Sequence, residues 1–163
     1  MAMVGLFWIT PEAVYVGSPP TTDGSCVRLT GYGVQAVEPG ASRTWAWKGL
    51  RSVAVQDVPR RGPARILSGF WESLLFSLSG GEAPPEMTVR LETGYGPEEL
   101  RVYSAAACGY GPDEAALSGE LLSRFAAGAA SPRALGAWAR DHGGDGTPRA
   151  RVRTELLRAW TEG

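Results

Sequence analysis

Short β-prone runs separated by turn residues fill the first two-thirds of the chain, and this pattern most constrains the fold. Residues 4–9 form a continuous apolar run, and residues 87–92 alternate between apolar and polar side chains. Both patterns are typical of strands, and clusters of Gly, Pro and Asp between runs mark turns. We expect roughly seven or eight short strands, enough for a strongly bent antiparallel sheet or a small barrel. The runs are residues 4–9, 13–16, 26–29, 34–37, 44–47, 51–58, 87–92 and 100–103.

Helix signals follow the strands. Pro112 precedes Asp113 and Glu114, and apolar residues then recur at helical spacing, which predicts a helix over residues 112–127 that closes the sheet. Cap-then-proline pairs at residues 131–132 and 147–148 open two further helices. The chain is therefore predicted to be α+β, with a β-rich domain over residues 1–128 and a helical C-terminal extension over 129–163 packed on it. The main alternative is another α+β fold with helices on one face of the sheet.

A segment between two predicted strands has helical rather than strand periodicity. Its apolar residues predict an amphipathic helix over residues 64–79. This helix either covers an open end of the barrel or pairs with another protein or a second copy, in a twofold dimer. We expect five of its residues to be partner-binding: Phe70, Trp71, Leu74, Leu75 and Leu78.

Charge is unevenly distributed in a chain of net charge −1. A basic band over residues 43–65 precedes an acidic band over 66–120. Arg60, Arg61 and Arg65 are candidate anion-binding residues, and the last predicted helix carries four more arginines that could contact phosphates: Arg149, Arg151, Arg153 and Arg158. A nucleic-acid-associated regulator is therefore the alternative function. Nucleic acid is the less favoured partner because the whole chain is not basic. The excess of arginine over the single lysine is typical of a GC-rich genome.

The residues that usually carry catalysis or bind metal are few. His142 is the only histidine, Cys26 and Cys108 are the only cysteines, and neither pattern predicts a metal site or a catalytic constellation. We therefore expect a non-enzymatic protein without cofactor or metal. No apolar run approaches the roughly 20 residues needed to span a bilayer, and no signal peptide is recognisable, so we expect a cytoplasmic protein without membrane contact.

Three Gly-Tyr-Gly triplets begin at Gly31, Gly94 and Gly109. They lack the Gly-Lys-Ser/Thr sequence of a phosphate-binding loop. Two interpretations remain open, namely independent hairpin turns or tyrosines presented for stacking on a ligand.

The order of strands followed by one closing helix resembles the pleckstrin-homology-like (PH-like) domains found in bacteria. The segment Thr44-Trp45-Ala46-Trp47-Lys48-Gly49 and the strand after it resemble a strand and turn of that family, and the resemblance covers residues 4–128. It implies a small barrel and a protein-docking role. Lipid-binding relatives carry basic residues near the first hairpin loop, whereas no basic residue precedes Arg28 here. The predicted function is thus a cytoplasmic protein-interaction module that docks a protein partner or forms a homodimer.

Overall fold

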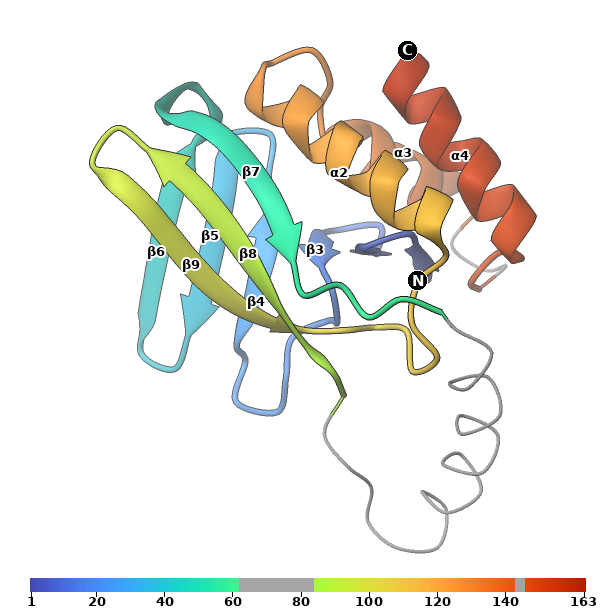
Figure 1. Cartoon of the computed structure of the whole chain (residues 1–163), viewed down its shortest axis with the longest axis horizontal. Coiled ribbons are helices and arrows are strands. Elements are labelled where there is room, and N and C mark those ends of the chain that lie inside the picture. The colour runs from blue at the N-terminus through green and yellow to red at the C-terminus, as the bar shows by residue number, and fades with distance from the viewer. Residues whose placement is uncertain (62–83, 143–145) are drawn as a thin grey trace, which may run out of the picture.

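The computed structural model describes residues 1–61, 84–142 and 146–163. Six short strands follow one another into an antiparallel sheet in the order of the chain (Figure 1). They are β1(Ala2–Val4), β2(Phe7–Ile9), β3(Val14–Val16), β4(Cys26–Leu29), β5(Gly33–Glu38) and β6(Ala41–Ala46). The short helical turn η1(Trp47–Gly49) then leads into a second antiparallel sheet of β7(Leu50–Gln56), β8(Glu86–Thr93) and β9(Gly96–Tyr103).

The two sheets face each other, with β4 in contact with β9 (Figure 1). Alternate residues of β4, β5 and β8 point into the space between the sheets, so Val27, Val34, Val89 and Leu91 are almost fully buried. At the edge strands, Arg43 of β6 forms an ion pair of 3.1 Å with Glu98 of β9. The sheets remain separate in the described parts of the chain. The α+β class is therefore confirmed, whereas a closed barrel is not observed.

The predicted strand over residues 4–9 is wrong, because the structure divides this run into β1 and β2. Gly5 has a φ of 56° and reverses the chain between them. This left-handed conformation favours glycine. A Cβ at residue 5 would also collide with Ser118 Oγ and lie 2.8 Å from Leu157 Cδ1. Contacts with two distant helices therefore impose a turn where local hydrophobicity favours one strand.

Three helices cover one end of the sheets: α2(Pro112–Ala126), α3(Arg133–His142) and α4(Ala150–Glu162). The predicted N-terminus of α2 is confirmed, with Pro112 in the first turn and the Glu114 carboxylate accepting a hydrogen bond of 3.2 Å from the Gly111 backbone N–H. Phe125 of α2 packs against Phe7 and Trp47, with ring centroids 6.4 and 5.8 Å apart. Helix α2 therefore joins both sheets into one hydrophobic core.

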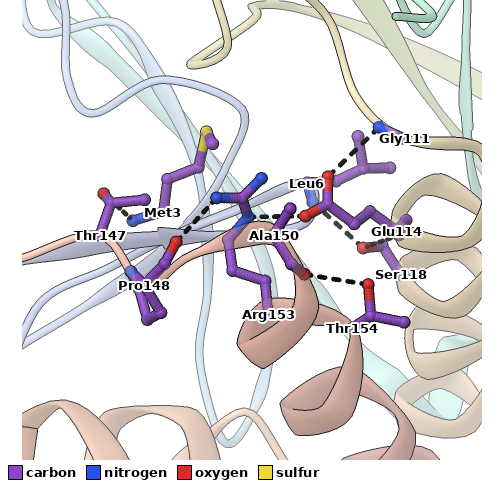
Figure 2. A network of polar contacts seen from close by, with 10 residues as sticks. All are labelled: Met3, Leu6, Gly111, Glu114, Ser118, Thr147, Pro148, Ala150, Arg153 and Thr154. Carbon is purple, nitrogen blue, oxygen red and sulfur yellow. Dashed lines mark hydrogen bonds and ion pairs between the residues drawn. The ribbon is translucent and has the colours of Figure 1, made fainter.

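Helix α4 lies against α2 and β1 and is held by buried polar contacts (Figure 2). Arg153 Nε donates to Glu114 Oε1 at 2.6 Å, and their side chains are only 7% and 4% exposed. Arg153 Nη1 also donates to the Pro148 carbonyl at 2.8 Å. Nearby, the Leu6 backbone N–H donates to Ser118 Oγ, which donates to the Glu114 carbonyl. Among the described residues, no helix has the length and apolar character required to cross a bilayer.

Candidate docking groove

Most of the predicted site residues lie outside the described residues. Phe70, Trp71, Leu74, Leu75, Leu78 and Arg65 all fall within 62–83, so their proposed roles stay predictions. Arg60 and Arg61 are described and exposed. The Arg61 backbone N–H donates to the Tyr110 carbonyl at 2.9 Å, which holds the backbone of Arg61 in place. Neither guanidinium forms an ion pair with another described residue.

Arginines of the last helix do not form one basic surface. Arg153 is buried against Glu114, whereas Arg151 is exposed and pairs with Glu155 at 2.9 Å. The prediction that the arginines of this helix could contact phosphates is therefore wrong for Arg153. Arg153 lies on the face of α4 that packs against α2, so its side chain points toward α2.

A groove of about 1140 Å³ lies between the two sheets. It lies at the end of the sheets opposite α2, where the β3–β4 loop and the β5–β6 turn meet β9 (Figure 1). None of its described lining residues belongs to a helix. Helices α2, α3 and α4 cover the other end of the sheets (Figure 1).

The floor of the groove is apolar and its rim is rich in proline. Val27, Ala36, Leu100 and Val102 come from β4, β5 and β9, and all four are buried. The rim contains four prolines, whose fixed φ angles restrict the loops that carry them. These residues are Pro19, Pro20, Pro39 and Pro84.

Hydrogen bonds hold the β3–β4 loop in place along the groove. The Ser18 backbone N–H donates to the Tyr103 carbonyl at 2.7 Å, which ties this loop to the end of β9. Farther along, Asp23 Oδ1 accepts from Thr21 Oγ1 at 2.5 Å and from the Ser25 backbone N–H at 3.0 Å. The hydrogen bond from Thr21, and then those from Ser25, lower the pKa of Asp23. This carboxylate is therefore ionised at neutral pH.

The groove carries an excess of negative charge. Among the described lining residues, four carboxylates, from Asp23, Glu38, Glu86 and Glu99, lie against the guanidinium of Arg101, so the excess is three charges. Glu86 pairs with Arg101 at 3.5 Å, and Glu99 pairs with Arg90 at 3.4 Å. Glu38 forms no ion pair with a described residue.

Cys26 lines the same groove and is half-buried. Burial raises the pKa of its thiol, and the nearby charge of Arg28 only partly opposes this effect. Because the thiolate is the nucleophilic form, a raised pKa makes Cys26 a poor nucleophile at neutral pH. Cys26 therefore contributes a small, weakly polar side chain to the lining of the groove.

The other residues considered as chemical candidates lie apart from the groove. His142 is exposed at the end of α3, where its ring stacks on Trp138 at 5.3 Å and Nδ1 lies 3.0 Å from the Trp138 carbonyl. Within the described ranges, no cluster of His, Cys, Asp and Glu could hold a metal ion.

The three Gly-Tyr-Gly triplets occupy different environments. The first two form the β4–β5 and β8–β9 turns, where Thr30 Oγ1 and Thr93 Oγ1 donate in the same way to the carbonyls of Gly33 and Gly96. Their tyrosines are exposed, whereas Tyr110 of the third triplet is buried. The first two are therefore hairpin turns, and the third lies in a packed connection.

A second hollow of about 540 Å³ lies between the N-terminal half of α2 and residues 55–60. Its lining includes Leu6, Val58 and Ala115, and Arg60 lies at its border. The chain continues from here into residues 62–83, which are outside the described part.

Sequence reasoning did not identify the groove, because its described lining comes from four separate segments. Pro19, Pro20 and Asp23 indicated a surface loop over residues 17–24, but nothing in the linear order showed which other segments this loop meets. Comparisons with known proteins add no further guide to the site. No protein-family profile matches the chain, no curated protein matches it, and no solved structure matches it. The resemblance to PH-like domains therefore stays a prediction.

Proposed function

We propose that this protein is a non-enzymatic interaction module that docks a protein segment in the groove between its two sheets. The groove is the single observation that carries this proposal. Its lining combines partly exposed apolar side chains, such as Val37 and Tyr103, with polar rim residues, and this combination is found at protein-binding surfaces. Its volume exceeds what one small side chain fills, and the lining strands belong to the rigid core rather than to free loops.

Two titratable residues of the groove, Asp23 and Cys26, are poorly suited to catalysis. Catalysis by proton transfer needs an acid or base within hydrogen-bonding reach of a reacting group, with a suitably perturbed pKa. Asp23 is instead engaged in its own turn, and its pKa is lowered. The raised pKa of Cys26 opposes a role as nucleophile. These residues support binding better than turnover.

Site-specific photo-crosslinking tests the proposal. Thr22 is exposed on the groove rim and is replaced by p-benzoylphenylalanine in the full chain. The matched control carries the same group at Ala137, which is exposed on α3 and does not line the groove. After irradiation in extract of the source organism, mass spectrometry identifies any cross-linked protein. We expect a discrete adduct from the Thr22 derivative and none of the same identity from the Ala137 derivative.

Absence of an adduct, or the same adducts from both positions, would contradict the proposal. An adduct between two copies of the chain would instead identify self-association, the second form of docking predicted from residues 64–79. Light scattering after size exclusion on the unirradiated samples separates these cases, because a homodimer has twice the mass of the chain.

A further inference from the structure

The charge and shape of the groove point to a particular class of partner, and this inference rests on the proposed docking function. We infer that the groove binds an extended peptide segment in which arginine or lysine alternates with apolar residues. Such a segment directs successive side chains to opposite sides, because the side-chain period of an extended chain is two residues. One side can then meet Glu38 and the neighbouring carboxylates, while the other covers the partly exposed apolar residues Val37 and Tyr103.

The position of β9 supports an extended occupant. β9 is the last strand of its sheet, and the structure places no further strand on its outer edge within the described residues. An extended segment lying along the part of this edge that precedes Tyr103, whose carbonyl already accepts a hydrogen bond from Ser18, can bind through backbone hydrogen bonds while its side chains enter neighbouring pockets. Leu100 and Val102 of β9 form part of the groove floor, so the edge and the floor are continuous.

Charge selects a basic rather than an acidic or neutral segment. The described lining carries four carboxylates against Arg101, and Arg90 pairs with Glu99 from outside the lining, so the local excess is two negative charges. Glu38 is exposed at the rim without an ionic partner among the described residues. Complementary charge accelerates association and disfavours partners of the wrong sign. The same excess repels phosphate groups, so this face is unsuited to nucleic acid.

The basic peptide can be tested without knowing the natural partner. The probe is a fluorescent synthetic peptide of alternating arginine and valine, about ten residues long, which in extended form spans about 33 Å. The comparison probe replaces arginine by glutamate. Fluorescence anisotropy with the full chain measures each Kd. We expect the arginine peptide to bind and the glutamate peptide not to bind, with an affinity that decreases as NaCl is raised.

Two charge-reversal variants separate the groove from the general charge of the protein. Glu38→Lys changes a groove residue, whereas Glu120→Lys changes an exposed residue of α2 outside the groove. Both alter the net charge equally, and circular dichroism checks that both fold. We expect Glu38→Lys to weaken binding of the arginine peptide about five- to tenfold, since repulsion replaces attraction at the site. Glu120→Lys should change the Kd less than about twofold, because charges beyond a Debye length are screened.

Three results would overturn the inference: no binding of the arginine peptide, equal binding of both peptides, or equal effects of the two variants. A protein that is dimeric without peptide and monomeric after Glu38→Lys would identify a second copy as the occupant and also overturn it. If the Thr22 derivative captures a partner although the arginine peptide does not bind, only the charge inference is wrong. Failure of both experiments contradicts the proposed function as well.

Discussion

At the scale of single residues, Tyr110 holds the connection between β9 and α2 in place. Its ring is 1% exposed, and its hydroxyl oxygen accepts a hydrogen bond of 3.0 Å from the Ala105 backbone N–H. Its own backbone N–H donates to the Pro59 carbonyl at 2.8 Å. The connection between β9 and α2 is thereby joined to the chain that follows β7. Burial is the main cause that raises the pKa of Tyr110.

Tyr110 should therefore make the folded protein sensitive to alkaline pH. Because the folded-state pKa exceeds the ordinary value of about 10, its stabilising contribution is complete below about pH 10 and is lost as pH rises through the folded-state pKa. Tyr110→Phe should cost about 1 kcal/mol at neutral pH, since the Ala105 N–H loses its acceptor, and should reduce the alkaline loss. Urea unfolding at a series of pH values measures both effects.

The control for this prediction is Tyr95→Phe, which changes the exposed tyrosine of the β8–β9 turn. It should leave the free energy of unfolding within about 0.5 kcal/mol of the unsubstituted protein. Parallel pH profiles for the Tyr110→Phe variant and the unsubstituted protein would show that Tyr110 does not cause the alkaline loss.

At the scale of elements, the contact between α2 and α4 depends on one buried ion pair (Figure 2). The Glu114 carboxylate accepts hydrogen bonds from the Arg153 side chain and from the Gly111 backbone N–H. The same carboxylate therefore caps the N-terminus of α2 and binds α4. A buried ion pair adds little net stability over an apolar replacement of both partners. Removal of one partner is costly, because the other charge remains buried without compensation.

Arg153→Met should destabilise the protein by about 3–5 kcal/mol, since Glu114 is left as an isolated buried charge. Chemical denaturation followed by circular dichroism measures the change. The matched control is Arg151→Met on the same helix, where the arginine side chain is 90% exposed, and its cost should stay below about 1 kcal/mol.

The double variant Glu114→Gln/Arg153→Met completes the cycle. It should be more stable than Arg153→Met alone, because it removes the uncompensated charge. Equal losses for Arg153→Met and Arg151→Met would show that the pair does not hold α4 in place.

At the scale of the whole molecule, the two sheets and the three helices bury one common core. Leu135 of α3 and Leu157 of α4 are fully buried in the same cluster as Val4, Phe7 and Leu121. Helix α4 also contacts β1 directly, so the end of the chain packs on its beginning. Residues 129–163 therefore cover a surface that the strands alone leave apolar.

Truncation after Ala130 should abolish cooperative unfolding. The shortened chain loses Leu135 and Leu157, each of which costs about 2–5 kcal/mol even when replaced only by alanine, and a domain is stabilised by only about 5–15 kcal/mol. Thermal melts by far-ultraviolet circular dichroism should show a broad transition at lower temperature in place of a sharp one. A sharp transition near that of the full chain would instead identify residues 1–130 as an independent domain.

Local signals in the sequence predicted the elements whose stabilising contacts are also local. Alternation over residues 87–92 predicted the inward and outward faces of β8, which pairs with β9 across a short turn. The proline and acidic residues at the start of α2 predicted its N-terminus because they meet backbone groups within one turn. These features, and the α+β class, could be predicted because neighbours in the chain are neighbours in the structure.

Only the tertiary structure decided the features that join distant segments. The turn at Gly5 depends on close approach to α2 and α4, and Arg153 is buried because Glu114 lies opposite it. The docking groove likewise forms where loops and strand ends of two sheets meet. The sequence by itself determined which segments prefer strand or helix, since those preferences act over a few residues. The packing of one segment on another determined that Arg153 is buried, that the apolar run is interrupted at Gly5 and that the groove forms between the sheets. These features depend on contacts between segments that are far apart in the chain.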